Sequence, residues 1–169
     1  MLSNGDLPKE QFNMQPRIDL MKYAKEPYRH LADLEKYLAS SSLGEKLTQL
    51  VKMRASQING CAYCLDMHSI DARAAGETEQ RLYTLNAWHE TPFFTDRERA
   101  ALAWTEAVTN ISQTHAPDNV YEDLKKYFNE KEIVDLTLAV GMINLWNRLA
   151  ISMRSLPGHY KPAARAAAS

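Results

Sequence analysis

The chain has 169 residues, with 20 basic and 21 acidic side chains and a formal net charge of −1. No stretch concentrates basic residues, so we expect no nucleic-acid partner, and no apolar run reaches the about 18 residues that a membrane span needs. A chain of this length can bury its own core, and we expect a single domain over residues 16–158, a flexible arm over residues 1–15 and a loose tail over residues 159–169.

Apolar residues recur at helical spacing through most of the chain and show no sustained strand-like alternation, so we expect an all-α fold. The first half should hold helices within residues 16–42, over 43–58 and over 62–75. Pro27 suits the first turn of a helix and should divide the first of these segments into a short helix and a long one. Asn59-Gly60 and Gly76 should end the two helices that follow.

Four further helices are expected, over residues 78–88, 96–111, 118–128 and 130–154. This makes about seven or eight helices in all. Thr95 and Glu98 have the spacing of a capping box before the second of the four. The last segment is apolar on much of its circumference, and a helix of that kind is buried, either centrally or at a subunit contact. We therefore expect a homo-oligomer.

The only two cysteines, Cys61 and Cys64, are spaced Cys-x-x-Cys, and His68 follows four residues after the second. In a helix, Cys64 and His68 would be neighbours on one face, which makes His68 a candidate proton acceptor for the thiol. A helix N-terminus and an adjacent histidine both lower a thiol pKa from its free value of about 8.5. The pattern therefore predicts redox chemistry. Two cysteines are not a disulfide framework, and no signal-peptide pattern opens the chain, so we expect the reducing cytoplasm.

A zinc site is the sharpest competing interpretation, because Cys-x-x-Cys also opens many zinc motifs. The sequence supplies no second Cys-x-x-Cys, and His89 and His115 lie at no familiar ligand spacing. We therefore expect no metal and no bound cofactor. A purely structural role is the other alternative, since a lone cysteine usually behaves as a small buried hydrophobic residue.

The segment from Leu50 to His68, with residues 71–79 after it, resembles the core of the alkylhydroperoxidase AhpD-like proteins of the carboxymuconolactone decarboxylase superfamily. Residues 88–99 and 143–148 are also similar to members of that group, so the resemblance covers most of the chain. The pattern of the family is a glutamate, then Cys-x-x-Cys, then a histidine four residues later.

This resemblance implies an all-helical, oligomeric peroxidase or disulfide reductase with an antioxidant role, in which Cys-x-x-Cys lies at the N-terminus of a central helix. It implies that Cys64 reacts with a hydroperoxide substrate and that Cys61 resolves the product to a disulfide. An external dithiol must then reduce the pair, and the resemblance suggests a lipoyl-bearing or similar protein. Separately, the lack of a long apolar stretch leads us to expect no membrane partner.

The sequence departs from the family pattern at Gln49, which occupies the position of the family glutamate twelve residues before Cys61. An amide can hold a hydrogen bond but cannot carry a proton. Glu45 lies four residues earlier on the same helical face and is the nearest acidic candidate to replace the glutamate, although a first-turn acid is more commonly solvated. Tyr63 stands where some AhpD proteins have a histidine. The candidate catalytic residues are therefore Cys64, Cys61, His68 and Gln49.

A different class of function is a non-redox member of the superfamily, either decarboxylase-like or a small-molecule-binding protein. Gln49, Tyr63 and the aromatic residues Tyr23, Trp88 and Trp146 favour this alternative. Aromatic residues at helical spacing belong to a core more often than to a pocket. Thiol titration before and after hydroperoxide treatment separates the two classes, because a binding protein should keep both thiols reduced.

Overall fold

A computed structural model describes residues 14–162, and within this range the chain forms helices joined by turns, without strands. The elements are α1 (Leu20–Tyr23), α2 (Lys25–Ala39), α3 (Glu45–Asn59), α4 (Ala62–Ala74), α5 (Glu79–Thr84), the 3-10 helix η2 (Leu85–Glu90), α6 (Asp96–Thr109), α7 (Ile111–Thr114), α8 (Asp118–Leu124) and α9 (Glu130–Met153). The all-α expectation is confirmed. The additional α-helix is α7, a single turn after α6, and the segment expected as one helix over residues 78–88 divides into α5 and η2.

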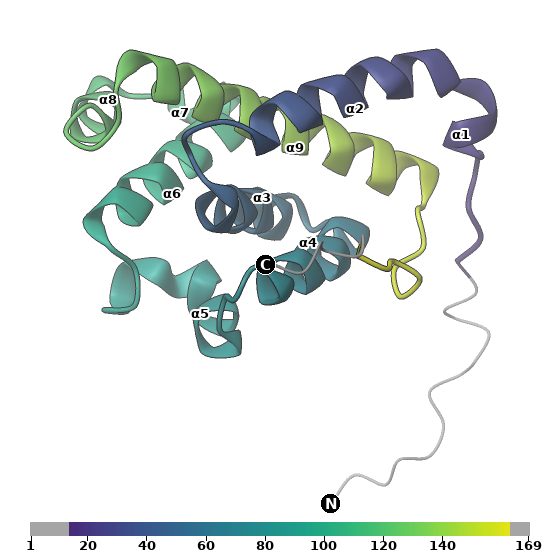
Figure 1. The fold of residues 1–169 in the computed structure, drawn as a ribbon, viewed down its shortest axis with the longest axis horizontal. Helices are drawn as coiled ribbons and strands as arrows, with labels where there is room; N and C mark the ends of the chain where they lie inside the picture. Colours follow the sequence, from purple (N-terminus) through teal and green to yellow (C-terminus); the bar gives the residue numbers. More distant parts are fainter. Residues whose placement is uncertain (1–13, 163–169) are drawn as a thin grey trace, which may run out of the picture.

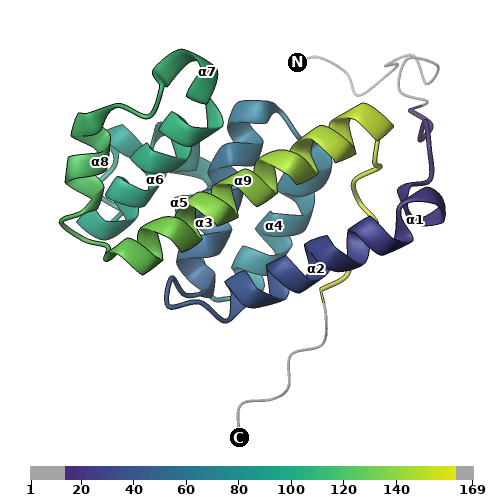
Figure 2. The same ribbon diagram turned by 90° about the horizontal axis from the view of Figure 1, so that it is seen from above.

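The central helix is α3, which packs against α4, α6 and α9. Figures 1 and 2 show α9 crossing over α3, with α2 beside α9, while α4 lies on another side of α3. The largest buried cluster joins α3, α6 and α9 through fully buried side chains such as Val51, Leu136 and Val140. Burying each of these apolar side chains stabilises the fold by about 1.5–3 kcal/mol.

The turn between α3 and α4 has the geometry that Asn59-Gly60 predicted. Gly60 adopts a left-handed conformation with φ of 69°, which a residue with a Cβ adopts only under strain. The N–H of Gly60 donates to the carbonyl of Gln57 at 3.3 Å, and that of Cys61 donates to the carbonyl of Ser56 at 3.0 Å. This pair of bonds is a Schellman motif. It ends α3 and leaves Cys61 as the N-cap residue of α4.

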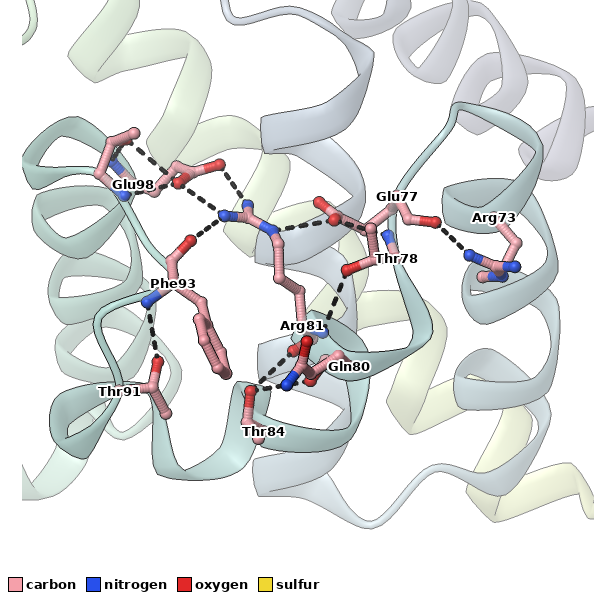
Figure 3. A network of polar contacts seen from close by, with 10 residues as sticks. Arg73, Glu77, Thr78, Gln80, Arg81, Thr84, Thr91, Phe93 and Glu98 are labelled. Carbon is pink, nitrogen blue, oxygen red and sulfur yellow. Dashed lines mark hydrogen bonds and ion pairs between the residues drawn. The ribbon is translucent and has the colours of Figure 1, made fainter.

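A polar network beyond the end of α4 fixes this helix against α5 and α6 (Figure 3). Arg81 pairs with Glu77 at 2.8 Å and with Glu98 at 2.5 Å, and Glu77 is only 5% exposed. Thr95 and Glu98 form the expected capping box at the start of α6. Removing one partner of a buried pair of this kind typically costs about 3–5 kcal/mol, so the network holds the helices around the cysteines in a defined arrangement.

The segment after α9 returns to α4. The N–H of Gly158 donates to Oδ2 of Asp66 at 2.7 Å, and the Tyr160 hydroxyl donates to Oδ1 of Asp71 at 2.8 Å. The described part of the expected loose tail, up to residue 162, is therefore attached to α4. Residues 163–169 of that tail and residues 1–13 of the expected arm lie outside the described residues. Between residues 14 and 162, no helix combines the length and the apolarity that crossing a bilayer requires.

Candidate functional site

The two cysteines lie side by side in a buried cluster where α3, α4 and α9 meet. Cys61 and Cys64 are both reduced, and each is 1% exposed. They share an apolar cluster with three side chains from α3 and α9, namely Ala55, Ile143 and Ala150. Tyr63 and Trp146 pack against this cluster and are partly buried. The thiols are therefore shielded from bulk water.

The surroundings of the two sulfurs move their pKa values in opposite directions. A hydrogen bond from the Cys64 thiol lowers the pKa of Cys61 to about 7, against the opposing effect of burial. The backbone N–H groups of Cys64 and Tyr63 and the side chain of Asn147 also stabilise the Cys61 thiolate. These two N–H groups belong to the first turn of α4, where an N-cap oxygen would normally accept them. The hydrogen bond with Cys61 and burial raise the pKa of Cys64.

Because these backbone N–H groups serve Cys61 and not Cys64, they favour the negative charge of the pair on Cys61. The sequence had assigned the attacking thiolate to Cys64 because that residue shares a helical face with His68. Cys64 is the third residue of α4 and lies one helical turn before His68, as expected. Its raised pKa argues against its being the first thiol to ionise. The hydrogen bond from Cys64 and the N–H groups at the N-terminus of α4 both favour a thiolate on Cys61.

Gln49, which occupies the position of the family glutamate, lies beside His68. Oε1 of Gln49 is 2.9 Å from Nδ1 of His68. Because an amide oxygen can only accept, Nδ1 carries the proton and donates, which leaves Nε2 as the nitrogen with a free lone pair. The amide of α3 therefore selects one tautomer of a histidine on α4.

His68 is neutral over the physiological pH range. Its side chain is buried, and burial together with the positive charge of Lys52 lowers its pKa from 6.5 to about 3. Lys52 is itself 8% exposed, and its Nζ pairs with Oε2 of Glu35 from α2 at 2.6 Å. Glu35 therefore pairs with Lys52, the lysine that opposes protonation of His68, and not with the histidine itself.

A cluster of buried polar side chains beneath the thiols was not among the sequence-based candidates. Asn147 of α9 is 0% exposed, and its side chain contacts Asn59 and Ser56 at the end of α3. Asn144, one turn earlier on α9, also accepts from Asn59. The available signal was the polar pair Asn144 and Asn147 among the largely apolar residues 138–151, in a stretch that also resembled the family.

The residues behind the alternative interpretations of the sequence lie in different parts of the structure. Glu45 lies in the exposed first turn of α3, away from His68 in the bonds that the structure records for that histidine. Tyr23 is 73% exposed and Trp88 belongs to a core cluster with α5 and α6 residues, so of the three aromatic side chains only Trp146 packs beside the thiols. Over residues 14–162, no three His, Cys, Asp or Glu side chains gather as a metal site would require.

Residues of α2 hold Trp146, one of the two aromatic side chains that cover the thiols. Nε1 of Trp146 donates to Oε1 of Glu35 at 2.9 Å, and the ring of Tyr28 meets the Trp146 ring edge-on with centroids 5.4 Å apart. Glu35 therefore binds both Lys52 and Trp146. A molecule that reaches the sulfurs must displace or pass this covering, because the sulfur-bearing side chains are almost fully buried.

An all-helical fold with a reduced Cys-x-x-Cys pair at the N-terminus of α4, a helix packed against the central α3, agrees with the AhpD-like class that the sequence resembles. The sequence model of the carboxymuconolactone decarboxylase family matches residues 25–107. The uncharacterized protein YdfG of Bacillus subtilis is 43% identical over 140 residues, which cover 83% of this chain and 95% of YdfG. The chain belongs to the carboxymuconolactone decarboxylase family, as an AhpD-like member.

Solved structures share the fold. A crystal structure of an Agrobacterium tumefaciens protein of unknown function, with a suggested role as the antioxidant defence protein AhpD, has a TM-score of 0.83 and 42% identity, covering 86% of this chain and all of that chain. The debrominase Bmp8 in complex with 2,3,4-tribromopyrrole has a TM-score of 0.73 and 20% identity, covering 89% of this chain and 81% of that chain. At that identity the likeness to Bmp8 concerns the fold alone.

Proposed function

We propose that the protein is a dithiol peroxidase in which Cys61 and Cys64 transfer two electrons to a hydroperoxide. The observation that carries the proposal is the reduced pair at the N-terminus of α4, with Cys61 at the N-cap; the hydrogen bond from Cys64 and the N–H groups of this turn lower the pKa of Cys61 to about 7. A thiol with this pKa is ionised to a large extent near neutral pH, and the thiolate is the form that attacks. Peroxide removal would give the protein an antioxidant role.

The reaction has two steps. In the first, the Cys61 thiolate attacks one oxygen of the hydroperoxide, the O–O bond breaks, and the alkoxide leaves and takes up a proton to become an alcohol. Cys61 is then a sulfenic acid. In the second, the sulfur of Cys64 attacks the sulfur of Cys61, loses its proton and displaces water as the disulfide forms. The pair has then lost two electrons and the peroxide has gained them.

The second step needs a group that accepts the proton of Cys64. We propose His68, one turn further along α4, with Gln49 fixing the tautomer that leaves Nε2 free to accept. A histidine with a pKa of about 3 is a weak acceptor, because burial and Lys52 both oppose its protonation. Disulfide formation should therefore be the slower step near neutral pH.

An external dithiol is needed to return the pair to its reduced state. Its thiolate attacks the Cys61–Cys64 disulfide, a mixed disulfide forms, and its second thiol completes the exchange. A lipoyl-bearing protein fits this chemistry, since it presents two thiols on a long arm that can reach a covered site. The covering side chains Tyr63 and Trp146 must move aside during this exchange.

Stoichiometric oxidation tests the proposal. The reduced protein is mixed anaerobically with one equivalent of an alkyl hydroperoxide, and free thiols and the alcohol product are quantified. We expect both thiols to disappear while one alcohol forms for each chain. Retention of both thiols with every hydroperoxide tested would exclude the peroxidase and favour the non-redox alternative. A parallel sample with tribromopyrrole detects reductive debromination, which also takes two electrons from a dithiol; oxidation there and not with hydroperoxides would make the protein a dehalogenase.

A further inference from the structure

The side chain of Asn147 is held in one orientation beneath the thiols. Its Oδ1 accepts from Nδ2 of Asn59 at 2.8 Å, and its Nδ2 donates to Oγ of Ser56 at 3.0 Å. These two bonds fix which end of the amide is oxygen and which is nitrogen. The side chain is 0% exposed, so water does not compete for either end.

One amide proton of Asn147 remains after the bond to Ser56. Nδ2 carries two protons and Ser56 takes one of them, so the second can serve the sulfurs; the Asn147 side chain is near enough to both Cys61 and Cys64 to lower the pKa of each thiol. Ser56 connects the two parts of this arrangement, because its backbone carbonyl also accepts from the N–H of Cys61 at 3.0 Å. Ser56 of α3 thus binds both the side chain of Asn147 on α9 and the backbone of Cys61 at the start of α4.

We propose that Asn147 stabilises the thiolate of the Cys-x-x-Cys pair, and that Asn59 and Ser56 are positioning residues that aim its amide N–H at the sulfurs. The inference deepens the proposed function, because it assigns a further residue to the same site. A donor preset in a buried environment stabilises an anion more than a flexible one in water. The same N–H can donate to either sulfur. It can therefore stabilise a thiolate on Cys61 or, when the disulfide is reduced, on Cys64.

The test measures the ionisation of the pair directly. The ultraviolet absorbance of the thiolate is followed against pH in the full-length reduced protein, which needs no reagent to reach the buried sulfurs. In the wild type the first thiol should ionise with a midpoint near the pKa of about 7 expected for Cys61. Loss of a donor raises a thiol pKa, so Asn147→Ala should move the midpoint upward by about one pH unit or more, which leaves about tenfold less thiolate below it.

Asn144→Ala is the matched control. Asn144 lies in the same polar network and accepts from Asn59, but its own Nδ2 donates to Thr109 and to the carbonyl of Val140, away from the sulfurs. This variant suffers a similar truncation and should keep the midpoint of the wild type. Equal shifts in the two alanine variants, or no shift in Asn147→Ala, would overturn the inference.

A second variant covers the case in which Asn147→Ala does not fold. Asn147→Asp keeps the shape and the acceptor for Asn59, but replaces the donor with a carboxylate that repels a thiolate, so the midpoint should rise further than in the alanine variant. An unchanged midpoint in Asn147→Asp would also overturn the inference. The titration requires no peroxide. If the midpoint shifts but no hydroperoxide oxidises the protein, the proposed function is refuted and the inference about Asn147 stands.

Discussion

Oε1 of Gln49 accepts a hydrogen bond from Nδ1 of His68 across 2.9 Å, so the amide that replaces the glutamate of the family contacts the histidine of the site. The contact orients the ring and fixes its tautomer without supplying a negative charge. Lys52, which is close enough to lower the pKa of His68, makes protonation harder still. The replacement therefore leaves the site with a histidine in place but with little basicity.

Substitution of Gln49 by glutamate should restore that basicity. A carboxylate beside Nδ1 favours the imidazolium and raises the pKa of His68 from its value of about 3. Since positioned acid–base groups contribute about 100- to 10,000-fold, we expect disulfide formation near neutral pH to accelerate by about tenfold or more. Rapid mixing of the Gln49→Glu variant with a hydroperoxide, with sulfenic acid and disulfide quantified over time, measures this step.

Glu45→Gln is the control for this experiment. Glu45 is the acidic residue that the sequence offered as a replacement for the family glutamate, and it lies in the exposed first turn of α3. Its loss should leave the rates and their pH profile unchanged. An unchanged rate of disulfide formation in a folded Gln49→Glu variant would show that proton transfer through His68 does not limit the reaction.

The two cysteine variants should differ in their first turnover. Cys61→Ser removes the thiol with a pKa of about 7 and should abolish the burst of peroxide consumption. Cys64→Ser should retain a burst of one equivalent that stops at a sulfenic acid on Cys61, since the resolving thiol is missing. Trapping with a sulfenic-acid reagent and mass spectrometry identify the modified residue. A burst from Cys61→Ser alone would return the attacking role to Cys64, as the family resemblance implied.

The sequence predicted those features that depend on a few neighbouring residues. Asn59-Gly60 ended α3, and Thr95 with Glu98 capped α6, because a left-handed glycine and a capping box are determined within one turn of helix. The all-α fold followed from helical spacing and from the family resemblance. The 3-10 helix η2 was missed, because the segment from Thr78 to Trp88 has an unbroken helical pattern in its side chains.

The balance between the two thiols could not be predicted in the same way. The ionisation of Cys61 depends first on the hydrogen bond from Cys64 and on burial, with an asparagine of α9 contributing, and the low pKa of His68 depends on burial and on a lysine of α3. Such contacts between distant segments exist only after the helices pack. The four-residue spacing of Cys64 and His68 is visible in the sequence, whereas the proximity of Asn147 to the thiols is not.

His68 should make the protein less stable in acid. Its pKa is about 3 in the folded protein and 6.5 without the fold, so between these values the unfolded state binds the additional proton. The free energy of unfolding should thus fall as the pH decreases from about 6.5 toward 3, by up to about 4–5 kcal/mol from this group. Urea unfolding at several pH values measures the slope. His68→Gln should flatten it, and an equal slope in this variant would assign the acid sensitivity to the carboxylates.

The outward face of α9 leads to the prediction that two or more copies of the chain associate. Val134, Leu138 and Leu145 are 55%, 40% and 38% exposed and follow one stripe of the helix. With Leu31 and Leu34 of α2, they line an apolar groove of about 430 Å³.

Gly141 lies at the middle of this stripe, and a Cβ there would meet nothing within 4 Å, so contacts within the chain do not require the glycine. In a helix interior glycine costs about 0.5–1 kcal/mol relative to alanine, whereas it allows the close approach of a second helix. We therefore expect the α9 helices of two chains to cross near Gly141. Leu138→Glu should yield a particle near the 19.2 kDa chain mass by light scattering, whereas Ile111→Glu, at a 54% exposed site on α7, should leave the assembly intact. A wild-type protein that is already monomeric at micromolar concentration would refute the association.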